Sequence, residues 1–317
     1  MNYREFTDAV EKEMNQKMTG GVKVSLHTAV KNNGKERVGV LIETPGINIS
    51  PTIYLEEYYE SYRKGRKFAQ IVDEIINFYN SIKKDQSWDC EGLRNYENVR
   101  ERVVFKLVNT AKNRKFLNTV PHRTFMDLSI VFYVLLGAAD NGTAALAVSD
   151  SHEEQWKVCA DALWTDAVRN VRKLLPAEFV TMNYALKQML REHAGQEAPE
   201  ERENLLLEHA GERDNMYILS NSLRSYGAAC IAYPHILEMI GEILRTDYYV
   251  LPSSVHEVII VPYSAGLDSR ELDEMVQEIN ITQVAEEEVL SSHAYLYQRS
   301  TGTLCSGNRK QAGRVTG

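Results

Sequence analysis

Apolar positions along the chain change between helical and strand spacing, and a turn signal accompanies each change. Near the start, apolar side chains recur four positions apart, at Phe6, Val10 and Met14. This spacing predicts a helix over about the first fifteen residues. Val22–Val30 and Val38–Ile42 then alternate around the segment NNGK at 32–35, whose residues tolerate the positive φ angles of a tight hairpin.

Two further helices are predicted after Pro51. The first, YLEEYYESYRKG, is rich in tyrosine and glutamate, and Gly65 suits its C-cap. The second has the most regular helical stripe of the chain, at Phe68, Ile71, Val72, Ile75, Phe78, Tyr79 and Ile82.

The middle of the chain has strand spacing and then returns to helical spacing. Arg102–Val108 and the strongly apolar Phe125–Leu136 are predicted strands, and Thr143–Val148 completes a hairpin with the second of them. Ser151 and Glu154 predict a capping box. The helix that it opens has apolar side chains at Trp156, Leu163, Trp164, Val168 and Val171.

The C-terminal part repeats this order. Tyr248–Leu251 and Val255–Val261 predict two strands joined by a tight turn at 252–254, and a helix follows with Asp268 and Glu271 as its cap. Hairpin-then-helix units are thus expected at roughly 22–64, 125–174 and 247–282. The fold class is α+β: antiparallel hairpins, each followed by a helix, with the helices packed on the sheet.

Four parts make up the predicted domain organisation. Residues 1–190 form an N-terminal hairpin and helix region, and residues 215–300 form a C-terminal α/β hairpin region that continues the same module. Residues 191–214 are acidic and predict a linker or a surface helix, which is expected to be exposed and mobile. Residues 301–317 hold too little apolar surface to offset the entropy of ordering, so a disordered tail is expected.

Composition narrows the classes of partner. The formal net charge is −8, from 44 acidic and 36 basic residues, and such a surface repels a phosphate backbone, so nucleic-acid binding is not expected. The longest apolar run, near 128–139, is shorter than the ~20 residues that a membrane helix needs, and no signal-peptide pattern opens the sequence. The four cysteines lie far apart without a CxxC pair, which favours a reducing cytoplasm.

Five segments together carry a family resemblance. They are NISPTIYLEEYY (48–59), VPHRTFMDLSIVFY (120–133), LLPAEF (174–179), YGAACIAYP (226–234) and YYVLPSSVHEVIIVP (248–262). The chain resembles a bacterial family of uncharacterised proteins filed as domain of unknown function 5688. The resemblance extends from the first helix to about Tyr297 and implies one module. It implies no activity, substrate or cofactor.

The first candidate site lies in and after the C-terminal turn, where a scaffold exposes functional groups. Ser253 and Ser254 offer hydroxyls and His256 an imidazole, which are the groups of a nucleophile and a base. Strand alternation, however, would place His256 and Glu257 on opposite faces of the sheet, so these two cannot form a dyad. Serine after proline is also common in turns that have no catalytic role.

A second candidate site follows Pro121. Arg123 has the geometry to hold a carboxylate or phosphate with two hydrogen bonds, and His122 can donate a proton. The alternative is structural: Arg123 would pair with Asp127, four residues away on the same strand face.

A tyrosine-rich helix gives a candidate binding surface. Its aromatic residues are Tyr54, Tyr58, Tyr59 and Tyr62. With glutamates between them, they would suit a basic or apolar protein partner. The alternative is that Tyr54, Tyr58 and Leu55 pack onto the first hairpin, with the tyrosine hydroxyls at the rim.

We therefore expect a soluble cytoplasmic protein that acts as a protein-binding or regulatory module. No cofactor and no metal are expected: His152-Glu153 and His256-Glu257 both lack the second histidine of a zinc-binding HExxH helix. The partner would be a protein, with no membrane contact. The alternative function is a hydrolase-type enzyme, with a site built from the His122/Arg123 and Ser253/His256 regions.

Overall fold

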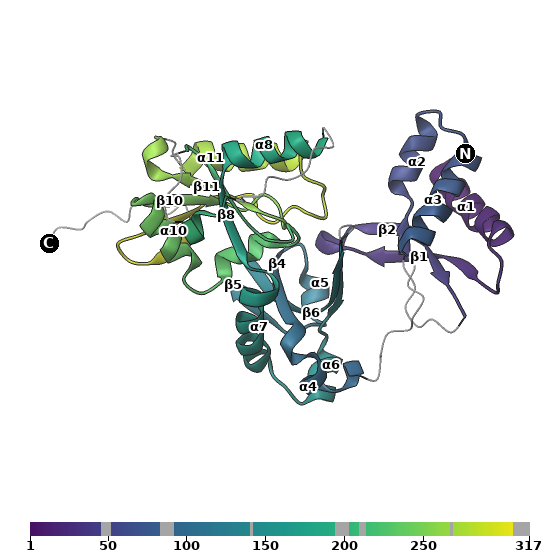
Figure 1. Ribbon diagram of the computed structural model, residues 1–317, viewed down its shortest axis with the longest axis horizontal. Helices are drawn as coiled ribbons and strands as arrows, with labels where there is room; N and C mark the ends of the chain where they lie inside the picture. Colours follow the sequence, from purple (N-terminus) through teal and green to yellow (C-terminus); the bar gives the residue numbers. More distant parts are fainter. Residues whose placement is uncertain are drawn as a thin grey trace. The chain divides into compact units, whose positions relative to one another are not determined.

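Two compact units make up the chain, Met1–Leu93 and Arg94–Gly317 (Figure 1). The computed structural model describes residues 1–45, 52–82, 92–139, 142–193, 203–208, 214–266 and 269–306. The division between the units falls inside residues 1–190, which are predicted to form one N-terminal region. Both units consist of antiparallel sheets with helices packed on them, so the predicted α+β class is confirmed.

In its described residues, the first unit has a three-stranded sheet and three α-helices. In chain order it comprises α1 (Tyr3–Lys17), β1 (Lys23–Val30), β2 (Glu36–Glu43), β3 (Thr52–Tyr54), α2 (Glu56–Arg63) and α3 (Phe68–Ile82). The strand order is β1-β2-β3. Asn33 and Gly34 have φ angles of 61° and 72° in the turn between β1 and β2, so the predicted hairpin is confirmed together with the reason for its turn residues.

A single apolar core joins the helices of this unit to its sheet. Its buried members are Phe6, Val10, Met14, Val24, Val40, Ile42, Ile53, Leu55, Ile71, Val72, Ile75 and Tyr79. Three of them are the α1 residues spaced four positions apart, and four belong to the stripe of α3. Each large apolar side chain buried in this way contributes about 1.5–3 kcal/mol to the free energy of unfolding, so the helical pattern in the sequence marks the face that is buried.

A four-stranded sheet opens the second unit. It consists of β4 (Val103–Asn109), β5 (His122–Phe125), β6 (Leu128–Ala139) and β7 (Gly142–Ala147). The central strand β6 pairs with β4 along one edge and with β5 and then β7 along the other. The predicted strand Phe125–Leu136 is therefore partly wrong, because Met126 has a φ of 57° and the chain reverses at Met126-Asp127.

A six-stranded antiparallel sheet completes the second unit. Its strands are β8 (Ala177–Thr181), β9 (Tyr217–Asn221), β10 (Tyr248–Leu251), β11 (Val258–Pro262), β12 (Tyr295–Gln298) and β13 (Thr303–Ser306). The order is β13-β12-β10-β11-β9-β8. Thr303–Ser306 pairs with β12, so these four residues do not belong to the predicted disordered tail. The rest of that tail, 307–317, lies outside the described residues.

Helices pack around both sheets of this unit. They are α4 (Tyr96–Val99), α5 (Arg114–Leu117), α6 (Asp150–Trp156), α7 (Ala160–Leu174), α8 (Met182–His193), α9 (Leu205–Glu208), α10 (Ile236–Leu244) and α11 (Ser269–Thr282). Helix α7 packs on β4, and α11 buries Leu272 and Val276 against β10 and β11. Ile130 and Phe132 of β6 and Val258 and Ile260 of β11 are all buried, as the strand patterns predict.

Two predicted helix caps differ from those in the structure. Helix α6 starts at Ser149, whose hydroxyl faces the Nδ1 of His152 at 2.8 Å, and the same Nδ1 accepts a hydrogen bond from the Ser149 backbone N–H. The predicted pair Ser151 and Glu154 is thus wrong by two residues. Lys157, with a φ of 55°, then ends α6 and separates it from α7. The predicted cap residue Asp268 lies outside the described residues.

Residues 203–208 protect the free edge of β8. Asn204 Oδ1 accepts from the backbone N–H of Phe179 at 3.1 Å, and Glu203 Oε2 accepts from the N–H of Thr181 at 2.8 Å. Leu205 and Leu206 of α9 are buried. This part of the predicted linker 191–214 is therefore packed on the sheet rather than exposed. Residues 194–202 and 209–213 of the linker lie outside the described residues.

Candidate functional site

The segment that carries Ser253, Ser254 and His256 is longer than the tight turn that the sequence predicts. Residues 252–257 all lie between β10 and β11. Their backbone pairs with residues 288–291: the N–H of Val255 donates to Glu288, and the N–H of Leu290 donates to the carbonyl of Ser253. Since this pairing uses residues far along the chain, alternation within 255–261 could not show where His256 lies.

Both ring nitrogens of His256 are engaged. Nδ1 accepts a hydrogen bond from the backbone N–H of Tyr226 at 3.4 Å, and Nε2 lies 3.3 Å from Oε1 of Glu288. In this arrangement Nδ1 is an acceptor and Nε2 is the nitrogen that can donate to Glu288. The hydroxyl of Ser254 accepts from the backbone N–H of His256 at 3.0 Å, so it caps the turn and is not activated by the imidazole. The carboxylate that meets His256 is Glu288, not the neighbouring Glu257.

Next to His256 lies a cluster of two tyrosine rings and a lysine that extends to β4. The ring of Tyr226 stacks on His256 with centroids 5.7 Å apart. Lys106 of β4 places its ammonium 4.2 Å from the centroid of the Tyr226 ring and 4.4 Å from that of Tyr133. Cation–π contacts of this kind stabilise a fold by about 0.5–2 kcal/mol. Sequence reasoning missed this cluster because its members come from distant segments without a shared motif.

His122, Arg123 and Asp127 lie near one another in sequence but have separate partners. His122 Nδ1 lies 3.0 Å from the carbonyl oxygen of Val120. Arg123 forms an ion pair with Asp161 of α7, and its guanidinium lies 5.4 Å from the Trp164 ring. The predicted pair of Arg123 with Asp127 is therefore wrong, because the turn at Met126 takes Asp127 away from that strand face.

Asp127 joins the two sheets of the second unit. Its Oδ2 accepts from the hydroxyl of Ser291 at 3.1 Å, and its Oδ1 accepts from the hydroxyl of Tyr295 in β12. Burial, with the nearby Asp127 carboxylate, raises the pKa of Tyr295. The carboxylate of Asp127 is thus used within the fold, and in the part of the chain that the structure describes its partners are Ser291 and Tyr295 rather than His256.

Three of the four candidate tyrosines of the first unit pack against its apolar core. Tyr58, Tyr59 and Tyr62 are partly buried and pack against the core of that unit. The ring of Tyr59 lies 5.3 Å from that of Phe6. Tyr54 ends β3, and Lys31 places its ammonium 4.0 Å from the Tyr54 ring centroid. Tyr59 and Tyr62 thus pack on α1 and Tyr54 lies beside the hairpin, which favours packing within the unit over an open aromatic surface.

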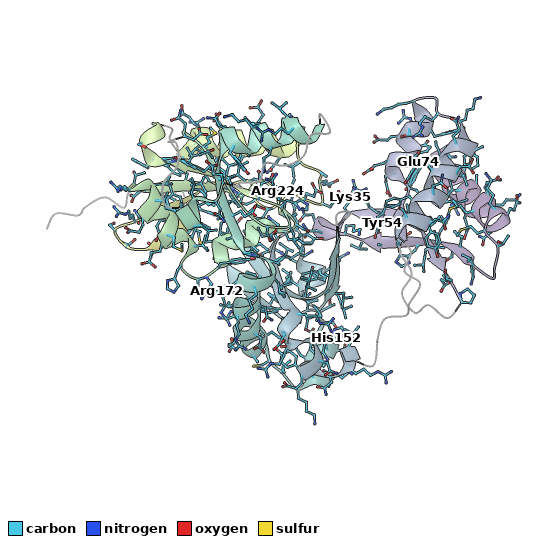
Figure 2. The ribbon with its side chains drawn as sticks, viewed as in Figure 1. Lys35, Tyr54, Glu74, His152, Arg172 and Arg224 are labelled. Atoms are coloured by element: carbon cyan, nitrogen blue, oxygen red, sulfur yellow. The ribbon has the colours of Figure 1, made fainter. Side chains whose placement is uncertain are left out.

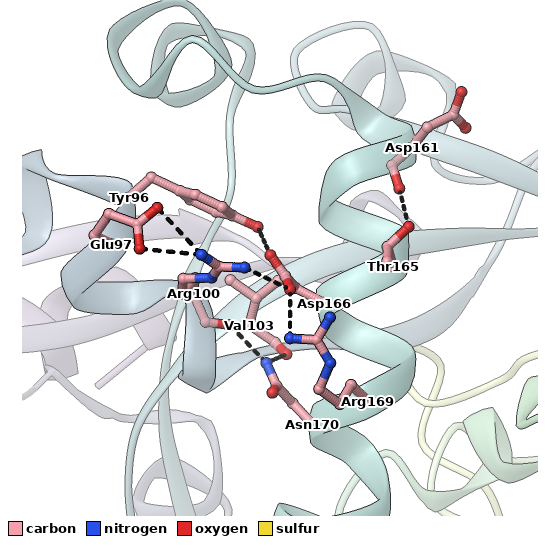
Figure 3. A network of polar contacts seen from close by, with 9 residues as sticks. All are labelled: Tyr96, Glu97, Arg100, Val103, Asp161, Thr165, Asp166, Arg169 and Asn170. Atoms are coloured by element: carbon pink, nitrogen blue, oxygen red, sulfur yellow. Dashed lines mark hydrogen bonds and ion pairs between the residues drawn. The ribbon is translucent and has the colours of Figure 1, made fainter.

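A buried acidic network in the second unit is fully paired. Figure 3 shows the carboxylate of Asp166 in α7 surrounded by a tyrosine and two arginines. Tyr96 donates its hydroxyl at 2.8 Å, and Arg169 and Arg100 approach to 3.2 and 3.5 Å. Burial and this carboxylate raise the pKa of Tyr96. Removing one partner of a buried charge is destabilising, and both oxygens of the Asp166 carboxylate are engaged here, so we assign this network to structure.

Exposed apolar side chains mark a different surface, on α8. Leu186, Met189 and Leu190 are 50%, 54% and 71% exposed and follow the spacing of one helix face. The opposite face of α8, with Tyr184 and Gln188, is partly buried. The apolar run LKQML contains this signal, but only the burial of the other face shows that it points outward.

Basic side chains lie on α8 and next to it. Lys187 and Arg191 of α8 are exposed. Arg224, labelled in Figure 2, donates a hydrogen bond to Gln188 of α8 and is also exposed. Lys187 lies three residues before Leu190 and so flanks the apolar stripe, whereas Arg224 contacts the opposite face of α8 through Gln188. On a chain of net charge −8, the basic residues of this helix differ from the average of the chain.

Two kinds of site have no support within the described ranges. No group of three or more His, Cys, Asp or Glu side chains there could hold a metal ion. In the same residues, no helix combines the length and the apolar character that crossing a bilayer requires.

Comparison with known proteins gives one result. A family model with the description "Family of unknown function (DUF5688)" matches residues 3–299. No curated protein matches the chain, and no solved structure matches it.

Proposed function

The chain belongs to the DUF5688 family, and we propose that it is a protein-binding module whose contact surface is the exposed face of α8. The observation that carries this proposal is the exposure of Leu186, Met189 and Leu190 on one face of a helix. Large apolar side chains grouped on a surface are typical of protein interaction sites. Burial of each in an interface would contribute about 1.5–3 kcal/mol to binding before the costs of association.

The spacing of these residues suggests how the partner is bound. Positions i, i+3 and i+4 of a helix are the anchors that fill an apolar groove in helix-in-groove recognition. Lys187 beside the stripe, with Arg191 one turn further along α8, favours a groove with acidic residues at its rim. The proposed partner is therefore a protein with an acidic-rimmed apolar groove.

The hydrolase alternative has less support. His256 is the only one of its predicted residues whose imidazole meets a carboxylate, at Glu288. The contacts of Ser254, His122 and Arg123 lead to other groups, so the described residues do not bring a nucleophile to that base.

The test compares the wild type with the double variant Leu186→Ser/Leu190→Ser. Both side chains are exposed, so the free energy of unfolding should change by no more than about 0.5 kcal/mol each. The variant should lose any protein that the wild type captures through α8. Ile281→Ser on α11 is the matched control, because Ile281 is an exposed apolar residue (83%) on another helix.

Charge provides the second arm of the test. Lys187→Glu/Arg191→Glu should weaken the same complex, and binding to the wild type should weaken as salt is raised. A captured protein that is retained equally by the wild type and both double variants would show that α8 is not the contact surface. Concentration-dependent dimers that the serine variant abolishes would assign the stripe to a second copy and contradict the proposal.

A further inference from the structure

A cavity lies at one end of the six-stranded sheet. It forms where β10 begins and β11 and β12 end, three adjacent strands of the sheet. Its volume is about 510 Å³, and it is a shallow depression that is largely open to solvent rather than an enclosed pocket. Its lining residues are Glu242, Arg245, Thr246, Asp247, Tyr263, Arg299 and Ser300. Three connecting segments therefore contribute to one cavity, and none of its residues is among the sequence candidates.

Asp247 holds these segments together. Its backbone carbonyl accepts from the N–H of Tyr263 at 2.9 Å, which fixes the segment after β11. Its Oδ1 accepts from the backbone N–H of Arg299 at 2.9 Å, which fixes the segment after β12. Among the described residues, Oδ2 of this carboxylate has no hydrogen-bond partner. Oδ1 therefore holds the cavity wall in place, and Oδ2 is available to a ligand.

The two arginines of the cavity differ in their pairing. Arg299 lies against Gly241 of α10, and its guanidinium pairs with Glu242 at 3.3 Å. Arg245 follows α10 with a φ of 58°, and its N–H donates to the carbonyl of Gly241. Within the described ranges, the guanidinium of Arg245 has no acidic partner. Arg299 and Glu242 thus neutralise one another, whereas Arg245 and Asp247 can each still form an ion pair with a ligand.

Tyr263 forms an aromatic wall. It is 54% exposed, and its ring stacks on Tyr249 of β10 with centroids 5.8 Å apart. An exposed ring that is supported from behind offers a fixed apolar face. Thr246 and Ser300 add hydroxyl groups to the lining.

We propose that this cavity binds a free α-amino acid. The ligand carboxylate would meet the Arg245 guanidinium, which forms two parallel hydrogen bonds with such groups. The ligand ammonium would meet Oδ2 of Asp247, and an apolar ligand side chain would lie along Tyr263. The two acidic and two basic residues of the cavity sum to zero charge. A ligand that carries both charges satisfies both unpaired groups, whereas a simple anion or cation would leave one of them without a partner.

Calorimetric titration of the full chain tests this inference directly. L-Phenylalanine and L-leucine are the probes, N-acetyl-L-phenylalanine lacks the ammonium, and L-phenylalanine amide lacks the carboxylate. We expect binding of at least one of the two amino acids and at least tenfold weaker binding of both blocked forms. Inorganic phosphate is the anion control and should not compete.

Variants locate the site. Arg245→Gln and Asp247→Asn should each weaken binding at least tenfold, and Asn at 247 can still accept from the Arg299 N–H, so the cavity should keep its shape. Arg270→Gln, an exposed arginine of α11, is the matched control and should bind like the wild type. Unchanged thermal unfolding of each variant excludes loss of fold as the cause.

Three results would overturn the proposal. They are no binding of either amino acid at millimolar concentration, equal binding of the blocked forms or of phosphate, and unchanged affinity in both cavity variants. Because α8 contributes no residue to this cavity, the outcome is independent of the protein-binding proposal.

Discussion

At the residue scale, the candidate polar side chains differ in whether the fold already uses their atoms. His256 has partners at both ring nitrogens, and the carboxylates of Asp127 and Asp166 each accept from a tyrosine. Arg245 and one oxygen of Asp247 have no such partner among the described residues. A polar side chain in a cavity is therefore a candidate ligand contact when some of its hydrogen-bonding atoms have no partner in the fold. Residue type alone does not make this distinction.

The segment 252–257 gives a prediction at this scale. Ser254→Ala and His256→Ala should each lower the free energy of unfolding by about 0.5–2 kcal/mol, because each removes a hydrogen bond that orders the segment. Urea denaturation measures the change. Ser253→Ala is the control, since the fold uses its backbone carbonyl, and it should have a smaller effect. A His256→Ala variant that unfolds like the wild type but loses an assayed activity would instead support the hydrolase alternative.

At the scale of elements, β8 shows how side chains protect a sheet edge. An unpaired edge strand offers its N–H and C=O groups to other chains. Here Glu203 and Asn204 occupy those groups: Asn204 also donates from Nδ2 to the carbonyl of Ala177 at 3.1 Å. Glu203 Oε2 further accepts from the Thr181 hydroxyl at 2.9 Å. Two side chains thereby replace part of a neighbouring strand.

Glu203→Ala tests this replacement. The change leaves the N–H of Thr181 without its charged acceptor and should lower the free energy of unfolding by about 1.5–3 kcal/mol. Limited proteolysis should also cut near residues 203–208 sooner than in the wild type. Glu203→Gln keeps an acceptor oxygen and should lose less. Equal stability of the alanine variant and the wild type would show that the edge does not depend on these bonds.

At the scale of the whole molecule, buried tyrosines make the free energy of unfolding decrease at high pH. Burial raises the pKa of Tyr233, Tyr248 and Tyr295. In the unfolded chain a tyrosine ionises near pH 10. Since the folded pKa values are higher, the stabilisation is complete below about pH 10 and is lost as the pH rises toward the folded values.

Urea denaturation at pH 8, 10 and 11 measures this loss. The free energy of unfolding should fall above about pH 10, and tyrosinate absorbance should rise together with unfolding. In Tyr248→Phe the fall should be smaller, although the lost hydrogen bond to Leu237 lowers stability at pH 8 by about 0.5–1.5 kcal/mol. A fall of equal size in wild type and variant would exclude Tyr248 as a contributor.

Local pattern determined many of the elements. Helices α1 and α3, the hairpin of β1 and β2, and the burial of β6 and β11 all follow from residue spacing and turn chemistry, because these depend on residues close in the chain. The acidic composition and the family resemblance were also properties of the sequence alone.

Tertiary structure decided what distant segments make together. The pairing of Arg123 with Asp161, of Asp127 with Tyr295 and of His256 with Glu288 each joins residues well separated in the chain. Strands β8, β9 and β12 are short and carry weak alternation, so their pairing partners define them. The stripe on α8 and the cavity beside Asp247 likewise became visible only through burial. Sequence spacing shows which face of an element is apolar, but only packing determines whether that face is covered.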